Sequence, residues 1–446
     1  MLDNNLCNEK CFLTKWFDAL HKRGINYAIL RNYQCLPNSC GGSDIDLWVK
    51  KSDYSAFLHV TCKIAKECGG MLVSKINDTT CPRLVFLSIS WGIQLDVHIG
   101  VAQHRGVVYM NNSIIEGHIE DYNGIKVLAP EIDSMISFLK EILNNKKCKD
   151  AYCLNASELV CNLSREEIDD YLSAFSQNIR EKIVDLLQRR DYSNESIREL
   201  GFQCSDDLQS FGSKLKYNWG QFLKLFRIFK PLGYTIAVLG TDGSGKSFII
   251  NHITPILNSG FHNGVKYEHM RPNFFPSLAV AIGKKKVSKE EHKECSNPHA
   301  SIPSGLIGSI IRLSYYWLDY TWGYFYKVFL DKSVKTHVWL FDRYYYDYYI
   351  DQRRARLNMP SWIIKLYGWF IPVPDLTICL GGDPVKIYSR KPETSLEEVT
   401  RQTRALQDFA KKHKRTIWVD TTVEPQDSIN AVMGAIIEMM SKRFKI

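Results

Sequence analysis

Glycine, lysine and serine residues near the middle of the chain have the spacing that binding of a triphosphate requires. The run is Gly240-Thr241-Asp242-Gly243-Ser244-Gly245-Lys246-Ser247. Its glycines let backbone N–H groups turn towards phosphate oxygens, Lys246 can reach the β- and γ-phosphates, and Ser247 can hold Mg²⁺. A plain glycine turn is the alternative, but the complete pattern seldom arises by chance. We therefore predict a site for ATP and Mg²⁺.

Paired carboxylates form a second set, far upstream. Asp44 and Asp46 stand two residues apart, directly after Gly42-Ser43, and Asp96 lies in a later alternating run. Because alternate residues of a strand share a face, two neighbouring strands would bring these three aspartates together. Three carboxylates can hold two Mg²⁺ ions about 4 Å apart for in-line attack on a nucleotide phosphate. The alternatives are solvated turn carboxylates, or a site that recognises its substrate without turnover.

An aspartate–arginine pair follows an apolar, strand-like run in the C-terminal half. Asp342-Arg343-Tyr344 comes directly after residues 336–341. In a parallel sheet the carboxyl ends of the strands line the ligand crevice. There Asp342 can ligate Mg²⁺ through water or accept a proton from the acceptor, and Arg343 can neutralise phosphate charge. These residue types favour a kinase over a generic ATPase.

The elements that must position these residues follow from the apolar runs around them. Strand-like runs in the C-terminal half, with helical stretches between them, cover residues 234–239, 336–341, 374–380 and 416–420. This alternation predicts an α/β domain in which helices flank a parallel sheet.

The N-terminal third predicts a smaller mixed α/β domain with a helical appendage. Helical patterns at residues 12–20 and 54–68 alternate with strand-like runs at 27–30 and 84–89. A helix begins at Pro130, and Ser164-Arg-Glu-Glu167 is a capping box. The predicted domains are 1–127, 128–230 as appendage and connector, and 231–446.

The C-terminal half resembles the thymidylate kinase family of P-loop kinases, in particular the type associated with bacterial surface-polysaccharide genes. The matching pieces are the loop at 240–247, Asp342-Arg343-Tyr344, Pro374-Asp-Leu376, a basic lid around Arg390, and Val419-Asp420. A Met270-Arg271-Pro272 element and an aromatic insert at 304–330 match the surface-polysaccharide type.

The resemblance implies a role for each matching residue. Lys246 and Ser247 would serve ATP and Mg²⁺, within a loop that also contributes Gly240, Gly243, Ser244 and Gly245. Asp242 would contact an acceptor hydroxyl, and Asp342 would position metal or acceptor. Arg343 would clamp the acceptor or the transferred phosphate, Arg390 would be the lid residue, and Arg271 would bind the acceptor phosphate.

The chain departs from the family where a thymine nucleotide would bind. Tyr345-Tyr346-Asp347-Tyr348-Tyr349 replaces the usual run with Ser and Gln, and an Arg-Glu-Pro-Gly element is incomplete. These departures argue against thymidylate as the acceptor. A sugar, alditol or nucleotide used in surface-polysaccharide assembly is the expected small-molecule acceptor.

The N-terminal third resembles the DNA polymerase β-like nucleotidyltransferases, on the Gly-Ser, Asp-x-Asp and later Asp pattern of Gly42, Ser43, Asp44, Asp46 and Asp96. The resemblance implies that Gly42 and Ser43 hold a triphosphate, that the aspartates hold metal, and that the domain transfers a nucleotide. Two other readings stay open. The chain could be a nucleotide-dependent switch with little turnover, or nucleotidyl transfer could be its main activity.

Composition agrees with a cytoplasmic enzyme. The 446 residues carry a net charge of +9, which suits acidic small molecules but is too evenly spread to indicate nucleic acid. The 13 cysteines predict reduced thiols. Two cysteine pairs are candidate metal ligands, Cys7 with Cys11 and Cys35 with Cys40. Neither has a second pair of ligands at the spacing of a zinc site. The aromatic residues 305–330 predict a helix packed on the core. Contact of this stretch with a membrane surface or a lipid-linked glycan is left open, as is a homodimer.

Overall fold

The computed structural model describes residues 7–76, 81–104, 107–208, 226–276 and 304–444, together with 218, 219, 222 and 278. The chain divides into two compact units, Met1–Lys224 and Leu225–Lys445. The predicted appendage helices belong to the first unit. Both units are α/β, and the second contains the parallel sheet flanked by helices that the alternating pattern predicted.

The first unit is built on a mixed sheet in the order β3-β4-β5-β2-β1-β9-β8. Its strands are β1 (Tyr27–Ile29), β2 (Ile45–Val49), β3 (Met71–Ile76), β4 (Arg83–Leu87), β5 (Gly92–Ile99), β8 (Ile119–Tyr122) and β9 (Ile125–Leu128). β2 and β5 run parallel, with Asp46 opposite Asp96. The two aspartate-bearing strands are therefore neighbours, as the sequence pattern required.

Helices cover both faces of this sheet. α1 (Glu9–Lys22) and α2 (Tyr54–Glu67) pack on one face, where the Trp16 ring is tilted against Phe17 and Phe17 stacks on Tyr27. Ala28 and Trp48, whose side chains point to the opposite face, join the core formed with the later helices. α1 is amphipathic because its buried residues recur at helical spacing.

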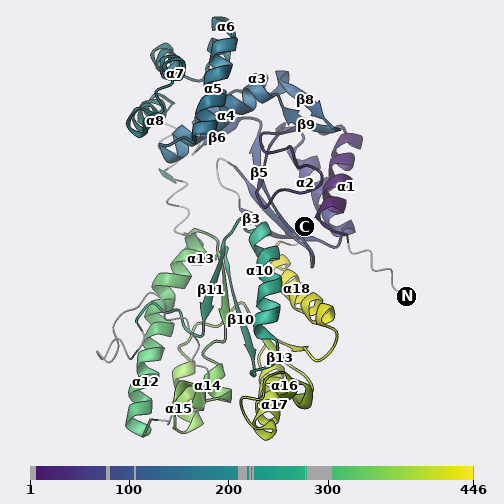
Figure 1. Ribbon diagram of the computed structural model, residues 1–446, viewed down its shortest axis with the longest axis vertical. Helices are drawn as coiled ribbons and strands as arrows, with labels where there is room; N and C mark the ends of the chain where they lie inside the picture. The colour runs from purple at the N-terminus through teal and green to yellow at the C-terminus, as the bar shows by residue number, and fades with distance from the viewer. Residues whose placement is uncertain are drawn as a thin grey trace. The chain divides into compact units, whose positions relative to one another are not determined.

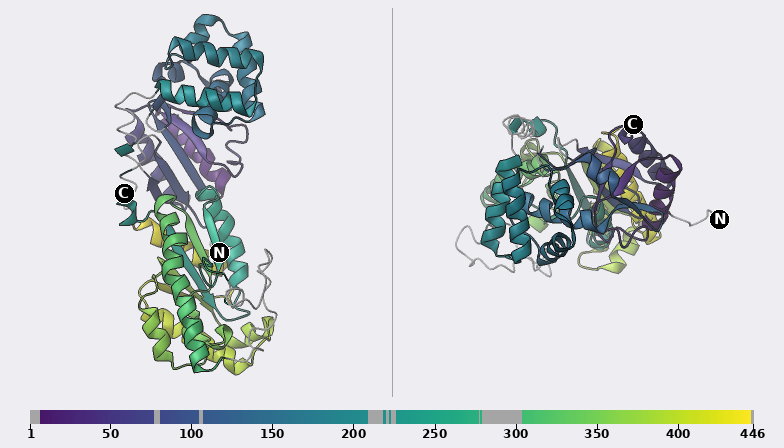
Figure 2. Two further views of the ribbon diagram at one scale, coloured as in Figure 1. Left: turned by 90° about the vertical axis from the view of Figure 1, so that its left-hand side faces the viewer. Right: turned by 90° about the horizontal axis from the view of Figure 1, so that it is seen from above.

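The later helices of this unit gather as a bundle at one end of its sheet (Figure 2). They are α3 (Asn112–Gly117), α4 (Pro130–Asn145), α5 (Asp150–Asn162), α6 (Arg165–Tyr171), α7 (Gln177–Arg189) and α8 (Asn194–Leu208), beside a hairpin of β6 (Ala102–His104) and β7 (Val107–Met110). Proline occupies the first turn of α4, and the Ser164–Glu167 capping box starts α6, as predicted.

The second unit has a five-stranded parallel sheet in the order β11-β12-β10-β13-β14. The strands are β10 (Tyr234–Gly240), β11 (Val265–His269), β12 (Val338–Asp342), β13 (Leu376–Gly381) and β14 (Thr416–Asp420). β10 is central; the chain builds one side through β11 and β12 and the other through β13 and β14. The ligand crevice of such a sheet lies at the carboxyl ends of its strands.

Two layers of helices enclose this sheet. α10 (Lys246–Gly260) and α18 (Pro425–Ser441) lie together on one side, and α12 (Leu306–Leu318) lies on the other (Figure 1). The remaining helical segments are η1 (Phe226–Ile228), η3 (Asp319–Phe329), α13 (Leu330–Val334), α14 (Asp347–Ile350), η4 (Arg353–Ala355), α15 (Ser361–Gly368), α16 (Pro384–Arg390) and α17 (Leu396–Lys412).

The aromatic insert forms one long helical rod, α12–η3–α13, whose middle part η3 is π-helical. Tyr320, Tyr344 and Tyr345 are fully buried and meet edge to face. The insert and the tyrosine run after Asp342 therefore pack together as core. No helix within the described ranges is both long and apolar enough to cross a membrane.

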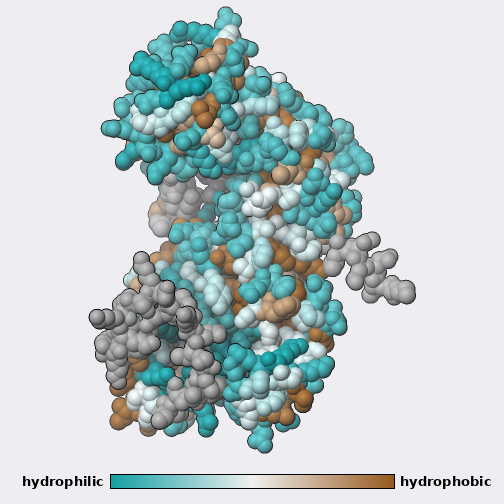
Figure 3. Space-filling model, in the orientation of Figure 1, coloured by the Kyte–Doolittle hydropathy of each residue, from teal (hydrophilic) through white to brown (hydrophobic). Residues whose placement is uncertain are grey.

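Apolar side chains are nevertheless exposed at the beginning of α12 and around α15. Figure 3 shows apolar atoms at the edge of the face where α12 begins. The most exposed are Ile307, Trp362, Trp369 and Phe370.

Candidate active site

The glycine loop joins β10 to α10 and has the backbone that phosphate binding requires. Gly243 and Gly245 have φ of +83° and +81°, in the left-handed region that side chains disfavour. A Cβ on Gly243 would lie 2.5 Å from the Ile387 carbonyl oxygen. The loop therefore needs glycine at this position, and its N–H groups can face a phosphate at the start of α10.

Lys246 is buried at the base of this loop. Its Nζ donates hydrogen bonds to the carbonyl oxygens of Gly240 (3.0 Å) and Thr241 (2.8 Å). Burial, followed by the nearby Arg343 guanidinium, lowers the pKa of Lys246 to about 7. The ammonium group thus rests on neutral carbonyls beside a second cation, an arrangement that an anionic ligand would stabilise.

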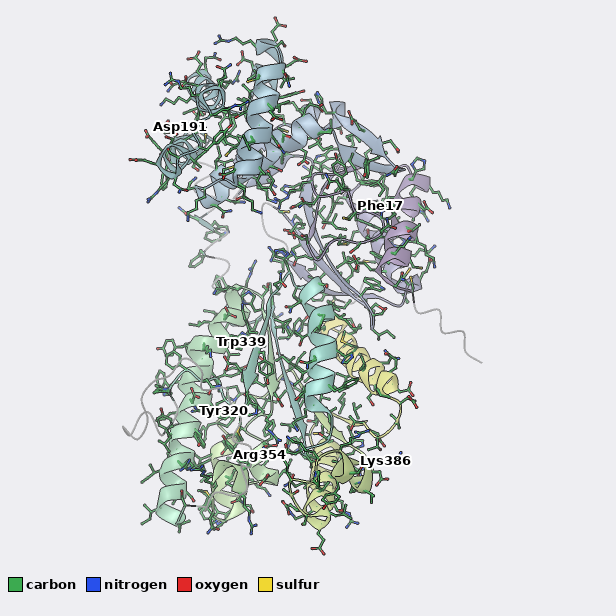
Figure 4. All side chains as sticks on the ribbon, viewed as in Figure 1. Phe17, Asp191, Tyr320, Trp339, Arg354 and Lys386 are labelled. Atoms are coloured by element: carbon green, nitrogen blue, oxygen red, sulfur yellow. The ribbon has the colours of Figure 1, made fainter. Side chains whose placement is uncertain are left out.

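Asp242 of the loop is held by two arginines from the other side of the crevice. Its Oδ1 accepts from Arg343 Nη2 at 2.7 Å, and its Oδ2 accepts from Arg354 Nη2. Burial opposes ionisation, but the two guanidinium groups keep the pKa of Asp242 well below its usual range. Figure 4 shows Arg354 at the end of the unit where Lys386 of α16 also lies.

Arg343 adopts a backbone conformation that is uncommon for a residue with a side chain. Its φ is +71°, and its amide donates to Val238 at 2.8 Å. Its Nη1 donates to Gly240 at 3.2 Å and to both carboxylate oxygens of Asp347 at 3.0 Å. Such strain persists where surrounding contacts fix it, and here they aim the guanidinium at the glycine loop.

Asp342 ends β12 with a carboxylate in the same crevice. Its Oδ2 accepts from the Tyr267 hydroxyl at 3.2 Å. Its Oδ1 is buried and has no hydrogen-bond partner among the described residues. A buried carboxylate oxygen without a partner is costly unless a ligand satisfies it. The residues therefore fit Mg²⁺ with a triphosphate, or a proton from an acceptor.

These side chains line one cleft of about 800 Å³. Its lining includes Gly243, Lys246, Ser247, Asp342 and Arg354. A second, smaller cleft of about 280 Å³ adjoins the start of α10. Its lining is more apolar: Phe248, Ile249, Thr421 and Pro425, with Arg390. Phe248 and Arg390 belong to both clefts, so one elongated ligand could extend from the glycine loop into the apolar cleft.

Two predicted arginines have different surroundings. Arg390 ends α16, lines both clefts, and donates from Nη2 to the Thr421 carbonyl at 3.0 Å. Arg271 is not among the residues that line either cleft. It pairs with the fully buried Asp319 of η3 at 3.1 Å and lies over the Tyr316 ring. Asp319 also accepts backbone N–H groups of residues 273–275, so this pair organises the segment after β11.

Sequence reasoning missed Arg354, Asp347 and Asp351 as members of this network. Arg354 Nε also lies 3.6 Å from Asp351 Oδ2. The signal was present, because Asp347, Asp351 and Arg354 recur at helical spacing after Asp342-Arg343. Their charges could not be assigned to the crevice until η4 was placed beside the glycine loop.

In the first unit, the structure brings the three predicted aspartates together. Ligand oxygens of Asp44, Asp46 and Asp96 all lie within 4.8 Å of one another. Gly42, at φ +73°, and Ser43, whose amide donates to Cys40, form the turn that leads to them. This geometry fits a divalent cation held by carboxylates.

Cations already surround this cluster. Asp46, only 2% exposed, accepts from Arg31 Nε at 2.5 Å and from Lys140 Nζ at 2.8 Å. Burial opposes ionisation, but Lys140 and Arg31 hold the pKa of Asp46 well below its usual range. Asp96 pairs with Arg83 at 3.4 Å, and burial raises the pKa of Asp96 to about 6. Any metal would have to compete with Arg31 and Lys140 for Asp46.

No family model matches the chain, and no curated protein matches it. Solved structures that it resembles include a thymidylate kinase from Candida albicans, with 17% sequence identity and a TM-score of 0.33. That match covers 46% of this chain and 91% of the other. A thymidylate kinase from Ehrlichia chaffeensis matches at 18% identity and TM-score 0.30, over 47% of this chain and 98% of the other.

Proposed function

We propose that the second unit transfers the γ-phosphoryl group of ATP to a small acceptor. The observation that carries this proposal is the pairing of two halves of a site across one cleft. Lys246 and the glycine loop lie on one side. On the other side lie Asp342, whose buried Oδ1 has no hydrogen-bond partner among the described residues, and Arg343 and Arg354, which reach across to Asp242 of the loop.

The donor side would hold ATP through the loop amides, Lys246 and the Ser247 hydroxyl. Bound Mg²⁺ supplies charge neutralisation on the β- and γ-phosphate oxygens. The apolar cleft formed by Phe248, Ile249 and Pro425 has the chemistry to receive the nucleoside base. Arg390, at the junction of the two clefts, would neutralise charge on the triphosphate.

The acceptor side offers carboxylates and guanidinium groups together. Asp342 Oδ1 can accept the proton of an acceptor hydroxyl. The hydroxyl oxygen then bonds to the γ-phosphorus as the bond between that phosphorus and ADP breaks. Arg343 and Arg354 are positioned to offset the charge on the transferred group. This polar lining favours an acceptor rich in hydroxyl groups. We propose that the acceptor is a sugar, alditol or nucleotide, and that the reaction serves surface-polysaccharide assembly.

Phosphorus NMR of Mg·ATP with the purified protein and fractionated small-molecule extracts tests this proposal. We expect ADP and a new phosphate resonance, both abolished by Lys246→Ala and retained in Lys411→Ala, an exposed lysine on α17. Arg343→Ala should lose turnover and keep ATP affinity. If slow hydrolysis were unchanged in Arg343→Ala and no acceptor resonance arose, a nucleotide-dependent switch would replace the kinase.

A second candidate activity, nucleotidyl transfer by the first unit, rests on the Asp44–Asp46–Asp96 cluster. Pyrophosphate release would accompany it. The double variant Asp44→Asn with Asp46→Asn should abolish pyrophosphate and leave ADP formation intact. If the first unit binds its substrate without turnover, neither the wild-type protein nor the double variant would release pyrophosphate.

A further inference from the structure

Three cysteines of the first unit meet, two of them close in sequence and the third more than fifty residues away. The sulfur atoms of Cys7, Cys11 and Cys68 all lie within 4.8 Å of each other. Cys7 precedes α1, Cys11 is in its first turn, and Cys68 is the C-terminal cap of α2. Sequence spacing revealed only the Cys7–Cys11 pair, because the third thiol comes from another helix.

Local hydrogen bonds fix the positions of the two α1 cysteines. Between them, Asn8 caps the helix, and its side chain accepts from the Cys11 amide at 2.9 Å. The Ser90 hydroxyl donates to the Cys7 carbonyl at 3.3 Å, tying this residue to the β4–β5 turn. Cys68 is buried, and its amide bonds the last carbonyls of α2. The cluster is therefore held from three separate elements.

The electrostatics of both helix ends suit thiolates around a cation. The N-terminus of α1 stabilises negative charge on Cys7 and Cys11. The carbonyl-rich C-terminus of α2 stabilises a cation beside Cys68. Lys15 is an exposed residue of α1 four positions after Cys11, on the same face of the helix. A divalent ion with three thiolates carries a net charge of −1, which Lys15 would balance.

We propose that Cys7, Cys11 and Cys68 bind one soft divalent cation of the zinc type through three thiolates. Sulfurs at about 2.3 Å from tetrahedral zinc lie about 3.8 Å apart, so the observed spacing needs only small side-chain adjustments. Binding releases the three thiol protons, and water takes the fourth position. Soft thiolates select zinc over magnesium or calcium.

The consequence extends to the aspartate-bearing loop. Glu9, between the two α1 cysteines, accepts from the Cys40 amide at 2.5 Å and from the Ser39 hydroxyl at 3.1 Å. Those residues lead into the Gly42–Ser43 turn and Asp44. A metal that clamps the start of α1 onto α2 would thereby fix the turn before the carboxylate cluster.

Metal titration of the reduced, chelator-treated full-length protein tests the proposal. We expect about one equivalent of Zn²⁺ to bind, and Co²⁺ in its place to give thiolate-to-cobalt charge-transfer absorption. Cys7→Ser, Cys11→Ser and Cys68→Ser should each weaken Zn²⁺ affinity at least about tenfold, since even outer-shell changes cost that much. Cys35→Ser and Cys161→Ser, both exposed, are matched controls and should leave affinity unchanged.

Wild-type protein alone can overturn the proposal, so the test does not depend on folding of the variants. Absence of the cobalt charge-transfer band from the reduced wild-type protein would exclude a thiolate site. Equal loss of affinity in the Cys35→Ser or Cys161→Ser controls would exclude this particular cluster. Far-ultraviolet circular dichroism of Cys7→Ser and Cys11→Ser, the two variants at partly exposed positions, separates loss of ligand from loss of fold.

Discussion

At the scale of single residues, Asp242 is shared by two guanidinium groups from different elements. Arg343 follows β12 directly, and Arg354 belongs to η4. A carboxylate so held keeps a fixed orientation at the mouth of the glycine loop. Loss of one arginine would leave one carboxylate oxygen of the largely buried Asp242 without its hydrogen-bond donor.

We predict that Arg354→Ala lowers kcat/KM for phosphoryl transfer on the order of ten- to hundredfold, as hydrogen bonds to charged groups are worth ~1.5–3 kcal/mol. Steady-state ADP release in the presence of acceptor measures the effect. Arg353→Ala, at the exposed neighbouring position, is the control. Equal activities of the two variants would show that Arg354 has no part in the site.

Lys246 gives a pH-dependent prediction. Its pKa of about 7 without ligand lies below the ordinary 10.5, so at pH 8 much of the free protein carries a neutral amine. A triphosphate favours the charged form and raises this pKa. We therefore expect proton uptake on ATP binding at pH 8, and affinity that falls as pH rises above 7. Calorimetry in buffers of different ionisation enthalpy measures the protons; no uptake at pH 8 would contradict the prediction.

At the scale of elements, the β10–loop–α10 unit depends on the close approach of Gly243 to α16. A side chain at this position meets the Ile387 carbonyl oxygen and must also adopt φ +83°. The glycine loop and α16, the helix that ends at Arg390, are thus packed backbone to backbone. Their relative position controls the shape of both clefts.

We predict that Gly243→Ala weakens ATP binding at least about tenfold, because strained backbone of this kind costs ~1–3 kcal/mol. Fluorescent-nucleotide titration gives the affinity. Gly434→Ala in α18 is the matched control: its Cβ meets nothing within 4 Å, and it should stabilise the helix by about 0.5–1 kcal/mol. Wild-type affinity in Gly243→Ala would mean that the loop shifts without cost.

At the scale of the whole molecule, each unit has its own sheet and its own buried core. Leu139 belongs to the core of the first unit, and the fully buried Leu380 lies in β13 of the second. Each chemistry proposed above is contained within one unit. The donor and acceptor sides of the proposed kinase cleft both come from the second unit.

We predict two thermal transitions in scanning calorimetry, one for each unit. Leu139→Ala and Leu380→Ala should each destabilise one unit by about 2–5 kcal/mol and lower only one transition. Nucleotide should raise only the transition that Leu380→Ala affects. A single transition lowered by both variants would show that the units unfold together.

Local patterns in the sequence were sufficient for the strand–loop–helix around Lys246, the alternation of Asp44 and Asp46, and the capping box at Ser164. Each depends on residues a few positions apart, whose backbone geometry and hydrogen bonds are set nearby. The parallel sheet flanked by helices in the second unit was also predicted, since short alternating strands and helices restrict the topologies available, but its strand order came from the structure. The structure agrees with these expectations.

Tertiary structure alone decided which distant charges and thiols meet. Arg354 reaches Asp242 across 112 positions, and Lys140 reaches Asp46 across 94. Arg271 pairs with Asp319 rather than lining the cleft, and Cys68 joins Cys7 and Cys11 from another helix. The physical reason is that ion pairs and thiol clusters depend on distances between packed elements. Local patterning determines which elements form, while packing of their buried faces determines which side chains share a site.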